Sequence, residues 1–268
     1  MTGSLTDSPA DLVHGTFSDD PPWLVEPDAM AWLAGVDTIR TATSRRLPSL
    51  ITPPRLPPLR RAITVVRHVG WALAAWLVVG RRKGGSESTA DLSRRMREAA
   101  ETLGPTYIKL GQIISSGEGV FPTELVEEFA KCRDQVPAES FASIRRAVEA
   151  DLGATLESTF AEFSREPIAE ESIAQVHAAT LHNGTEVVVK VQRPTVDDLV
   201  HKDLRVMAWL SPYLVGRIPV ASLANPPALV EVFAHTISEE LDFRLEAANM
   251  LDVARVFADL EQTHFVVP

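Results

Sequence analysis

The stretch His182-Asn-Gly-Thr-Glu-Val-Val-Val-Lys-Val-Gln192 decides the fold class of this chain. The Asn183-Gly184 pair tolerates the positive φ angles of a two-residue hairpin turn, so we expect two antiparallel strands to meet here. The second strand is the β-branched run 186–192, whose alternate residues point to opposite faces of the sheet. Lys190 therefore projects from the middle of an apolar strand. The other face carries Val187, Val189 and Val191.

Helical spacing of apolar residues dominates on both sides of this hairpin. Before it, we expect helices over 90–103, 106–115, 122–132 and 141–152, and a short helix or loop over 156–163. After it, we expect a helix over 196–214, one long helix over 226–260, and the beginning of a strand over 265–267. Helices, hairpin, helices and a further strand in this order indicate an α+β fold.

Charge and composition divide the chain into four segments. Residues 1–38 carry seven acids and no Lys or Arg, which is typical of a disordered leader. Residues 39–86 carry ten basic residues and no acid. The mixed-charge remainder comprises a helical extension over 87–163 and the hairpin-containing lobe over 164–268. Two apolar patches of the leader, Trp23-Leu-Val25 and Met30-Ala-Trp-Leu33, could dock on a surface or belong to a locally collapsed tail.

The basic segment combines prolines with an apolar run. Pro48, Pro53, Pro54, Pro57 and Pro58 are expected to exclude a helix from its first part. The run 69–79 that follows contains two Trp residues and is flanked by arginines. It suits a helix at the surface of an anionic membrane, because a spanning helix needs about 20 apolar residues. A buried helix of the domain and a true span remain the alternatives.

Composition excludes several classes of protein. A formal net charge of −10 argues against binding to nucleic acid through bulk charge. Cys132 is the only cysteine, so an intramolecular disulfide is impossible. The spacing of Cys and His residues matches no zinc site, and we predict no metal-binding residues. The first 20 residues lack the basic and apolar regions of a secretory signal.

Lys190 requires a countercharge if its strand is buried. The run Glu239-Glu-Leu-Asp-Phe-Arg-Leu-Glu246 offers acids on an otherwise apolar helix. A strand lysine paired with a helix glutamate positions nucleotide phosphates in kinases. Two alternatives stay open. Lys190 reaches solvent from the edge of a sheet, or the acidic run is only a solvated helix face.

Four segments together resemble the UbiB/AarF family of atypical protein-kinase-like proteins. They are Lys109-Leu-Gly-Gln112, which is similar to the KxGQ motif; Pro167 to His177, similar to the Ala-rich loop; Val187 to Pro194, similar to the strand-lysine motif; and Glu240-Leu-Asp242 with Glu246-Ala-Ala-Asn249, similar to the ExD motif and the helix glutamate. Each match alone is weak, but the four occur in the family's order across 103–249. The resemblance leaves the acidic leader uncovered.

The resemblance implies a fold and a set of site residues. The fold is a kinase-like N-terminal lobe, with a small antiparallel sheet and a long helix, preceded by a family-specific helical extension. Lys190 would contact nucleotide phosphates and pair with Glu246, and Lys109 and Gln112 would cover the site near Glu240 and Asp242. The nucleotide-binding loop would include Ala169, Ser172, Ile173, Ala174 and Gln175.

Helical geometry adds a condition to these roles. In one regular helix Asp242 and Glu246 share a face, whereas Glu240 and Asp242 diverge by about 200°. Either the helix breaks near Leu241, or the two acids have different partners.

Two departures from the family pattern affect the expected chemistry. Glu170 and Glu171 stand where the family has alanines, and acids beside a triphosphate repel it unless a cation intervenes. We also find no His-Gly-Asp or Asp-Phe-Gly segment, and we expect a fragment with no second lobe and no catalytic residues of its own. The family implies ATP with Mg as cofactor, but we expect binding here to be weak or absent and phosphate transfer to be undetectable.

The favoured function is that of an ATP-binding kinase-like protein linked to isoprenoid quinone or lipid metabolism. The expected partners are a membrane lipid surface and quinone-biosynthesis proteins, without nucleic acid, and the expected location is cytoplasmic and peripheral to the membrane. Two alternatives stay open: a non-catalytic adaptor that responds to nucleotide or lipid, and a helical membrane-surface scaffold. The reading frame after Pro268 would distinguish the adaptor from an enzyme. A measurement of nucleotide binding would distinguish the scaffold from both.

Overall fold

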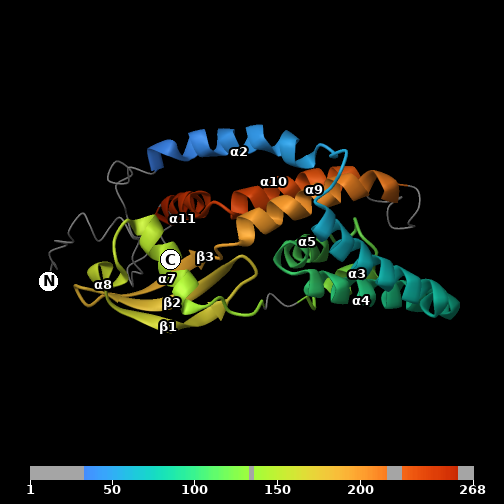
Figure 1. Cartoon of the computed structure of the whole chain (residues 1–268), viewed down its shortest axis with the longest axis horizontal. Helices are drawn as coiled ribbons and strands as arrows, with labels where there is room; N and C mark the ends of the chain where they lie inside the picture. Colours follow the sequence, from blue (N-terminus) through green and yellow to red (C-terminus); the bar gives the residue numbers. More distant parts are fainter. Residues whose placement is uncertain (1–32, 133–135, 216–224, 259–268) are drawn as a thin grey trace.

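A computed structural model describes residues 33–132, 136–215 and 225–258. The Trp23–Val25 patch, most of the 30–33 patch and the expected strand over 265–267 lie outside the described residues. The sheet lies at one end of the molecule and helices α3 (Leu59–Val78) and α4 (Gly85–Leu103) at the other (Figure 1).

The sheet has three antiparallel strands in the order β1 (Phe160–Glu170), β2 (Ala174–Leu181) and β3 (Glu186–Gln192). The predicted hairpin between β2 and β3 is confirmed, but the expected positive φ at both central positions is found at Gly184 and not at Asn183. Gly184 has a φ of 87° in the turn, and the Leu181 N–H donates to the Thr185 carbonyl over 2.9 Å. Strand β1 was missed, because the segment after 156 was interpreted as a short helix or loop. That interpretation holds only for α8 (Leu156–Thr159).

Helix α7 (Phe141–Leu152) covers one face of the sheet and builds a small core there. Ser140 caps its N-terminus by accepting a hydrogen bond from the Ser143 N–H, and Gly153 ends it in the left-handed conformation. Val187 and Val191 of β3 are buried against it, while Val188 on the opposite face is 42% exposed. The predicted alternation of β3 is therefore confirmed, and Lys190 lies on the face away from α7.

A larger core joins the helices of the extension to those that follow the sheet. Helices α5 (Pro105–Ser115), α6 (Thr123–Phe129) and α9 (Val196–Leu214) meet α3 and α4 around Leu103, Ile114, Phe129 and Leu204. Ile173 and Ala174, at the start of β2, are buried in this helical core and not in the core under α7. The fold prediction is confirmed: a small antiparallel sheet, helices and a helical extension form a kinase-like N-terminal lobe.

The prediction that prolines exclude a helix from the first part of the basic segment is wrong for Pro48 but holds for Pro53, Pro54, Pro57 and Pro58, which lie between two helices. Helix α2 (Val36–Ile51) contains Pro48, and α3 begins immediately after Pro58. Pro48 lies in the last turn of α2, where its missing N–H removes one hydrogen bond, to the Ser44 carbonyl, and the helix ends three residues later. The Pro48 carbonyl still accepts from the Thr52 N–H over 3.0 Å. A short 3-10 helix, η2 (Leu33–Gly35), precedes α2, so helical structure begins within the segment interpreted as leader.

The single helix expected over 226–260 is divided into α10 (Pro226–Glu240) and α11 (Phe243–Ala258). The break falls at Leu241–Asp242, where sequence geometry had left a break as one of two possibilities. Asp242 accepts a hydrogen bond from the Arg244 N–H over 3.1 Å at the start of α11, which gives the new helix a polar cap. Helix α2 lies along α10 and α11 (Figure 1).

Candidate functional site

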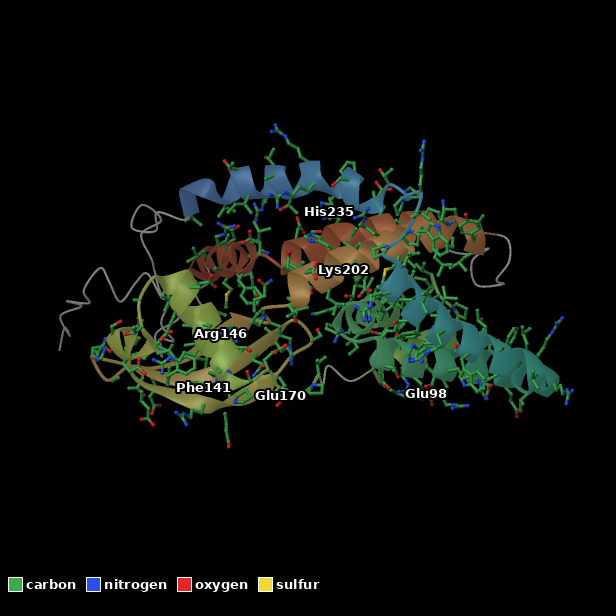
Figure 2. All side chains as sticks on the ribbon, in the orientation of Figure 1. Glu98, Phe141, Arg146, Glu170, Lys202 and His235 are labelled. Atoms are coloured by element: carbon green, nitrogen blue, oxygen red, sulfur yellow. The ribbon has the colours of Figure 1, made fainter. Side chains whose placement is uncertain are left out.

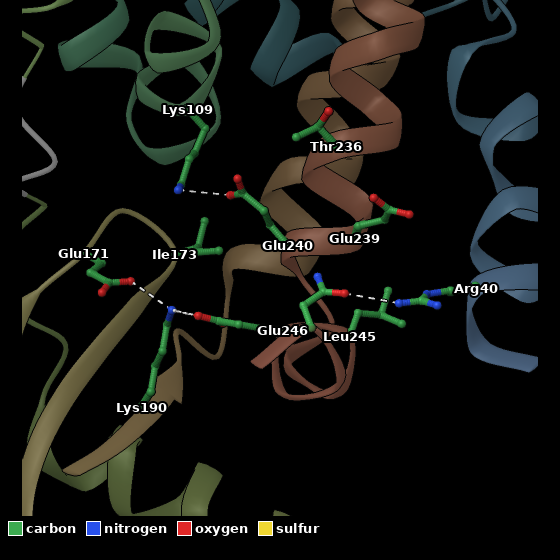
Figure 3. A pocket seen from close by; sticks show the side chains of 11 residues that line it. Arg40, Lys109, Glu171, Ile173, Lys190, Thr236, Glu239, Glu240, Leu245 and Glu246 are labelled. Carbon is green, nitrogen blue, oxygen red and sulfur yellow. Dashed lines mark hydrogen bonds and ion pairs between the residues drawn. The ribbon is translucent and has the colours of Figure 1, made fainter. Parts of the chain in front are cut away.

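A cavity of about 520 Å³ lies where α2, α5, α10, α11 and the turn between β1 and β2 approach one another. Its walls are strongly charged, and Figure 3 shows the charged side chains directed toward one another from these different elements. The cations are Arg40, Lys109 and Lys190, and the carboxylates are Glu171, Glu239, Glu240 and Glu246.

Lys190 reaches this cavity from β3. Its Nζ donates to both oxygens of Glu246 on α11, over 2.9 and 3.1 Å, and lies 3.4 Å from Oε2 of Glu171 (Figure 3). It also lies 5.1 Å from the centre of the Phe243 ring. Burial lowers the pKa of the Lys190 ammonium, but the hydrogen bond and charge of Glu246, with those of Glu171, outweigh burial and hold the pKa above its ordinary value. The lysine is therefore charged.

The predicted pairing of Lys190 with Glu246 is confirmed. A lysine on a buried strand also predicts that this pair is the main buried ion pair of the lobe, and that prediction is wrong. The two side chains are 32% and 44% exposed. Because the cavity is open to solvent, water screens the pair. A fully buried carboxylate is found instead at Asp203 of α9, which Arg61 of α3 contacts.

The second lysine of the cavity is Lys109 on α5. Its Nζ lies 3.0 Å from Oε2 of Glu240, the last residue of α10 (Figure 3). Asp242, two residues further on, pairs instead with Arg244, whose Nη2 lies 2.7 Å from Oδ2. The helix break and the different partners, which sequence geometry offered as alternatives, therefore occur together.

Gln112 lies one helical turn from Lys109 on α5 and does not line the cavity. Between them, Gly111 permits a close approach of α5 to α6. A Cβ at Gly111 would lie 2.4 Å from Cδ1 of Phe129, which is far closer than packed atoms allow. The glycine of this motif therefore has a packing role, and it sets the position from which Lys109 reaches Glu240.

The predicted nucleotide-binding loop is mostly buried. Ser172, Ala174 and Gln175 are fully buried and Ile173 is 3% exposed, whereas Ala169 is exposed at the end of β1. Of these five, only Ile173 lines the cavity. The Gln175 side chain accepts a hydrogen bond from the Glu139 N–H, which ties the loop to the segment before α7. Glu171 is the charged side chain of this loop that lines the cavity.

Sequence reasoning missed Arg193, which fixes this loop. The Arg193 side chain is 4% exposed, and its guanidinium donates to the carbonyls of Glu171, Val136 and Pro137 over 2.8–3.0 Å. It thus holds the backbone of the loop against the segment that enters α7. A cation directly after a buried strand was the available signal, because such a cation needs partners.

Sequence reasoning also missed the contact between Arg61 and Asp203. Arg61 donates to both oxygens of Asp203, and its Nη2 also donates to the Leu103 carbonyl over 2.6 Å at the end of α4. These bonds join α3, α4 and α9, and the Arg61 guanidinium also lies 5.7 Å from the centre of the Tyr107 ring on α5, the helix that carries Lys109. Charge counting assigned Arg61 to the membrane-facing basic flank, since nothing local distinguishes it from Arg60.

Among the residues that the structure describes, no three His, Cys, Asp or Glu side chains are grouped to hold a metal ion. The cavity carboxylates pair with lysines: Glu246 and Glu171 with Lys190, and Glu240 with Lys109. The described part of the site thus offers cations for an anionic ligand but no built set of ligands for Mg.

Comparison with known proteins gives a consistent result. Residues 131–268 match the model of the ABC1 atypical kinase-like domain. Curated relatives carry the name "Probable protein kinase UbiB". The protein from Aeromonas hydrophila subsp. hydrophila is 40% identical over 168 residues, which cover 62% of this chain and 31% of the relative. The protein from Edwardsiella ictaluri is 36% identical over 201 residues, which cover 75% of this chain and 36% of the relative.

The chain spans about a third of the length of these relatives. The family match includes β1–β3 and all residues that line the cavity except Arg40 and Lys109. On this evidence the chain belongs to the ABC1 atypical kinase-like family.

Proposed function

We propose that the cavity binds the phosphates of ATP and that Lys190 is the residue that contacts them. The observation that carries this proposal is the contact of Lys190 Nζ with both Glu246 oxygens inside a solvent-open cavity. A strand lysine held by a helix glutamate is the arrangement with which kinases orient phosphates. The lysine is charged and partly exposed, so it fits an anionic ligand.

The residues of this chain would hold and orient the nucleotide. Glu246 fixes the direction of the Lys190 side chain, and Arg193 holds the backbone of the loop that ends at Glu171. When bound, Mg would neutralise phosphate charge. Among the described residues, no group of three or more His, Cys, Asp or Glu side chains is placed to hold it. Because Glu171 competes for Lys190, we expect weak binding by the chain as given.

Titration calorimetry with ATP and Mg at millimolar concentration tests this proposal. Lys190→Met should weaken binding about tenfold or more, because it removes a charge-assisted contact to phosphate. Lys202→Met is the matched control, since Lys202 is 49% exposed on α9, does not line the cavity and pairs with Asp198 within its own helix. Equal binding by both variants would reject the role of Lys190.

We propose further that α3 lies on an anionic membrane surface. Leu59, Ile63, Val66, Trp71 and Leu77 are 48–77% exposed on one side of this helix. Arg60 and Arg67 are also exposed, as are Arg81 and Arg82 after its end. Exposed apolar groups beside arginines favour an interface with acidic lipid.

One helix of the described residues, Leu59–Arg82, is long and apolar enough to cross a membrane. Packing supports a peripheral position instead. Ala62, Val65 and Ala72 are buried on the other side of α3, and Trp76 Nε1 donates to the Ser88 carbonyl of α4 over 3.1 Å. A helix that crossed the bilayer would lose these contacts with α4.

Co-sedimentation with vesicles distinguishes the possibilities. The chain should bind vesicles that contain phosphatidylglycerol and not vesicles of phosphatidylcholine alone, and high salt should release it. Replacing Ile63 and Trp71 by Ser should reduce binding. Resistance to alkaline carbonate extraction from cells would reject the peripheral position, and so would equal, negligible binding to both vesicle types.

A role in isoprenoid quinone or lipid metabolism, with quinone-biosynthesis proteins as partners, is the third part of the proposal. It rests on the UbiB name of the relatives and on the two preceding inferences. Deleting the gene in its host should lower the quinone content that mass spectrometry measures, and expression of the gene should restore it. An unchanged quinone content would reject this part and leave nucleotide binding untouched.

A further inference from the structure

The carboxylate of Glu171 occupies the second side of the Lys190 ammonium. Glu246 Oε1 lies 2.9 Å from Nζ and Glu171 Oε2 lies 3.4 Å from it (Figure 3). Both acids are partly exposed in the cavity, at 37% and 44% of their side chains. A phosphate that approaches Lys190 therefore meets a carboxylate already in place.

The balance of charges around Lys190 determines what a phosphate must displace in order to bind it. The cavity has three cations against four carboxylates, so its formal charge is negative before a ligand enters. Lys109 is held by Glu240, and Arg40 donates to the Asn249 side chain over 3.2 Å. An anionic ligand therefore does not find an excess of positive charge in this cavity, and one carboxylate must leave Lys190 before a phosphate can bind it.

Glu171 is the acid that can leave with the smallest rearrangement. Its backbone is fixed, because its N–H donates to the Ala174 carbonyl over 3.0 Å and its carbonyl accepts from Arg193. Displacement consequently requires only rotation of the Glu171 side chain. Glu246 makes the two shorter contacts from a helix, so it stays with the lysine.

We propose that Glu171 determines the selectivity of this cavity among phosphate ligands, excluding those that carry their full charge and admitting those whose charge a divalent cation reduces. The proposal rests on the nucleotide site proposed above. After rotation the carboxylate still lies beside the bound phosphates, and repulsion is strongest when no cation compensates it. Selectivity then comes from a repulsive group as well as from the attractive lysine.

The experiment compares ATP in EDTA with ATP in excess Mg, by calorimetric titration of the 268-residue chain and of two variants. Glu171→Gln removes the charge and keeps the size of the side chain. Glu170→Gln is the matched control, because Glu170 precedes it at the end of β1 (Figure 2) and has no ion-pair partner in the described part of the chain. Glu171→Gln should lower the Kd of free ATP about fivefold, as expected for the removal of one partly exposed charge. The ratio of the affinity for Mg-ATP to the affinity for free ATP should therefore decrease. Glu170→Gln should leave both affinities unchanged.

A second measurement shows whether the substitution acts through Lys190. In lysine-labelled protein, Glu171→Gln should lower the pKa of Lys190 that NMR measures, and Glu170→Gln should not. If the chain binds ATP and the two variants give the same affinities, the proposed selectivity is rejected and the nucleotide site remains. If no variant binds ATP in either condition, the nucleotide site is rejected and the selectivity with it.

Discussion

At the residue scale, Arg61 and Asp203 show what a buried charge requires in this protein. Burial raises the pKa of the Asp203 carboxyl above its ordinary value, and the hydrogen bonds and charge of Arg61 oppose that effect. Asp203 in turn holds the pKa of Arg61 above its ordinary value although burial lowers it. The ionised pair thus depends on both partners, and either one alone would be a buried charge without compensation.

Arg61→Met should lower the free energy of unfolding by about 3–5 kcal/mol, because it leaves Asp203 buried without a countercharge. Urea denaturation measures the effect. Arg60→Met is the control: Arg60 is exposed on the same helix and should change stability by less than about 0.5 kcal/mol. Adding Asp203→Leu to Arg61→Met should restore part of the loss. Equal stabilities of the two single variants would contradict the importance of the pair.

The pair of Lys190 and Glu246 should behave differently, because both side chains are about one-third exposed or more. A double-mutant cycle with Lys190→Met and Glu246→Gln should give a coupling energy of about 1 kcal/mol or less. A coupling of about 3–5 kcal/mol would mean that the cavity is closed to water in solution. The surface pair Lys202–Asp198, at four residues' spacing on α9, provides the reference cycle.

At the scale of elements, the break between α10 and α11 separates the acids of one sequence motif. Glu240 ends α10 and faces Lys109, whereas Asp242 caps α11 and pairs with Arg244. The hydrogen bond from Arg244 holds the pKa of the Asp242 carboxyl below its ordinary value of 3.8, and burial opposes this only in part. Asp242 therefore stabilises the folded chain through its charged form.

This shift predicts how stability depends on pH. Because the folded pKa of Asp242 is depressed, its contribution is present above pH 3.8 and is lost as the pH falls through the folded pKa. Asp242→Asn should cost less than about 1 kcal/mol at pH 7 and progressively less below pH 4. Urea titrations of both proteins from pH 2.5 to 7 measure the difference. In an Arg244→Met background this pH dependence should become smaller, because the side-chain bond and charge are lost while the backbone N–H of residue 244 still donates to Asp242. An unchanged pH dependence would assign the effect to another carboxyl.

The elements also differ in how far local sequence predicts them. The hairpin and β3 were predictable because Asn-Gly and a β-branched run act within a few residues. Strand β1 was missed because its pairing with β2 is interrupted between Phe160 and Glu162 and twice more between Phe163 and Ala169, so that no regular alternation appears. Pro48 was misleading because a proline near the end of a helix removes only one backbone hydrogen bond, so that α2 continues through it and ends three residues later.

At the scale of the whole molecule, two cores meet at the start of β2. One lies between α7 and the sheet, and the other lies among the helices. Ile173, 3% exposed, belongs to the helical core although it directly precedes a strand of the sheet. The same residue lines the cavity next to Glu171. The position of the loop over Lys190 therefore depends on how the sheet docks on the helices.

Ile173→Ala should destabilise the chain by about 2–5 kcal/mol, the cost of a cavity in a core. Ile168→Ala is the matched control, because Ile168 is 59% exposed on β1 and should cost less than about 1 kcal/mol. Thermal or urea unfolding measures both. If Ile173→Ala costs no more than Ile168→Ala, the two cores do not depend on this contact for their docking.

The sequence by itself indicated several of the charged side chains that line the cavity, among them Lys109, Lys190, Glu240 and Glu246. A lysine in the centre of a β-branched strand, an Asn-Gly turn before it and an acidic run after it are all local. Together with the resemblance to the UbiB/AarF family, they indicated the kinase-like lobe and the pairing of Lys190 with Glu246. Geometry along one helix also showed that Glu240 and Asp242 could not both serve the same partner unless the helix broke.

Tertiary structure alone decided which of these groups share a cavity and how exposed they are. The contact of Glu171 with Lys190, the three carbonyls held by Arg193 and the burial of Asp203 against Arg61 join segments that lie 19 to 142 residues apart. Such contacts depend on the packing of α3, α9 and the sheet, and no periodicity or propensity within a segment encodes them. The physical reason is that the free energy of a charge is set by its surroundings, and those surroundings exist only after the chain has folded.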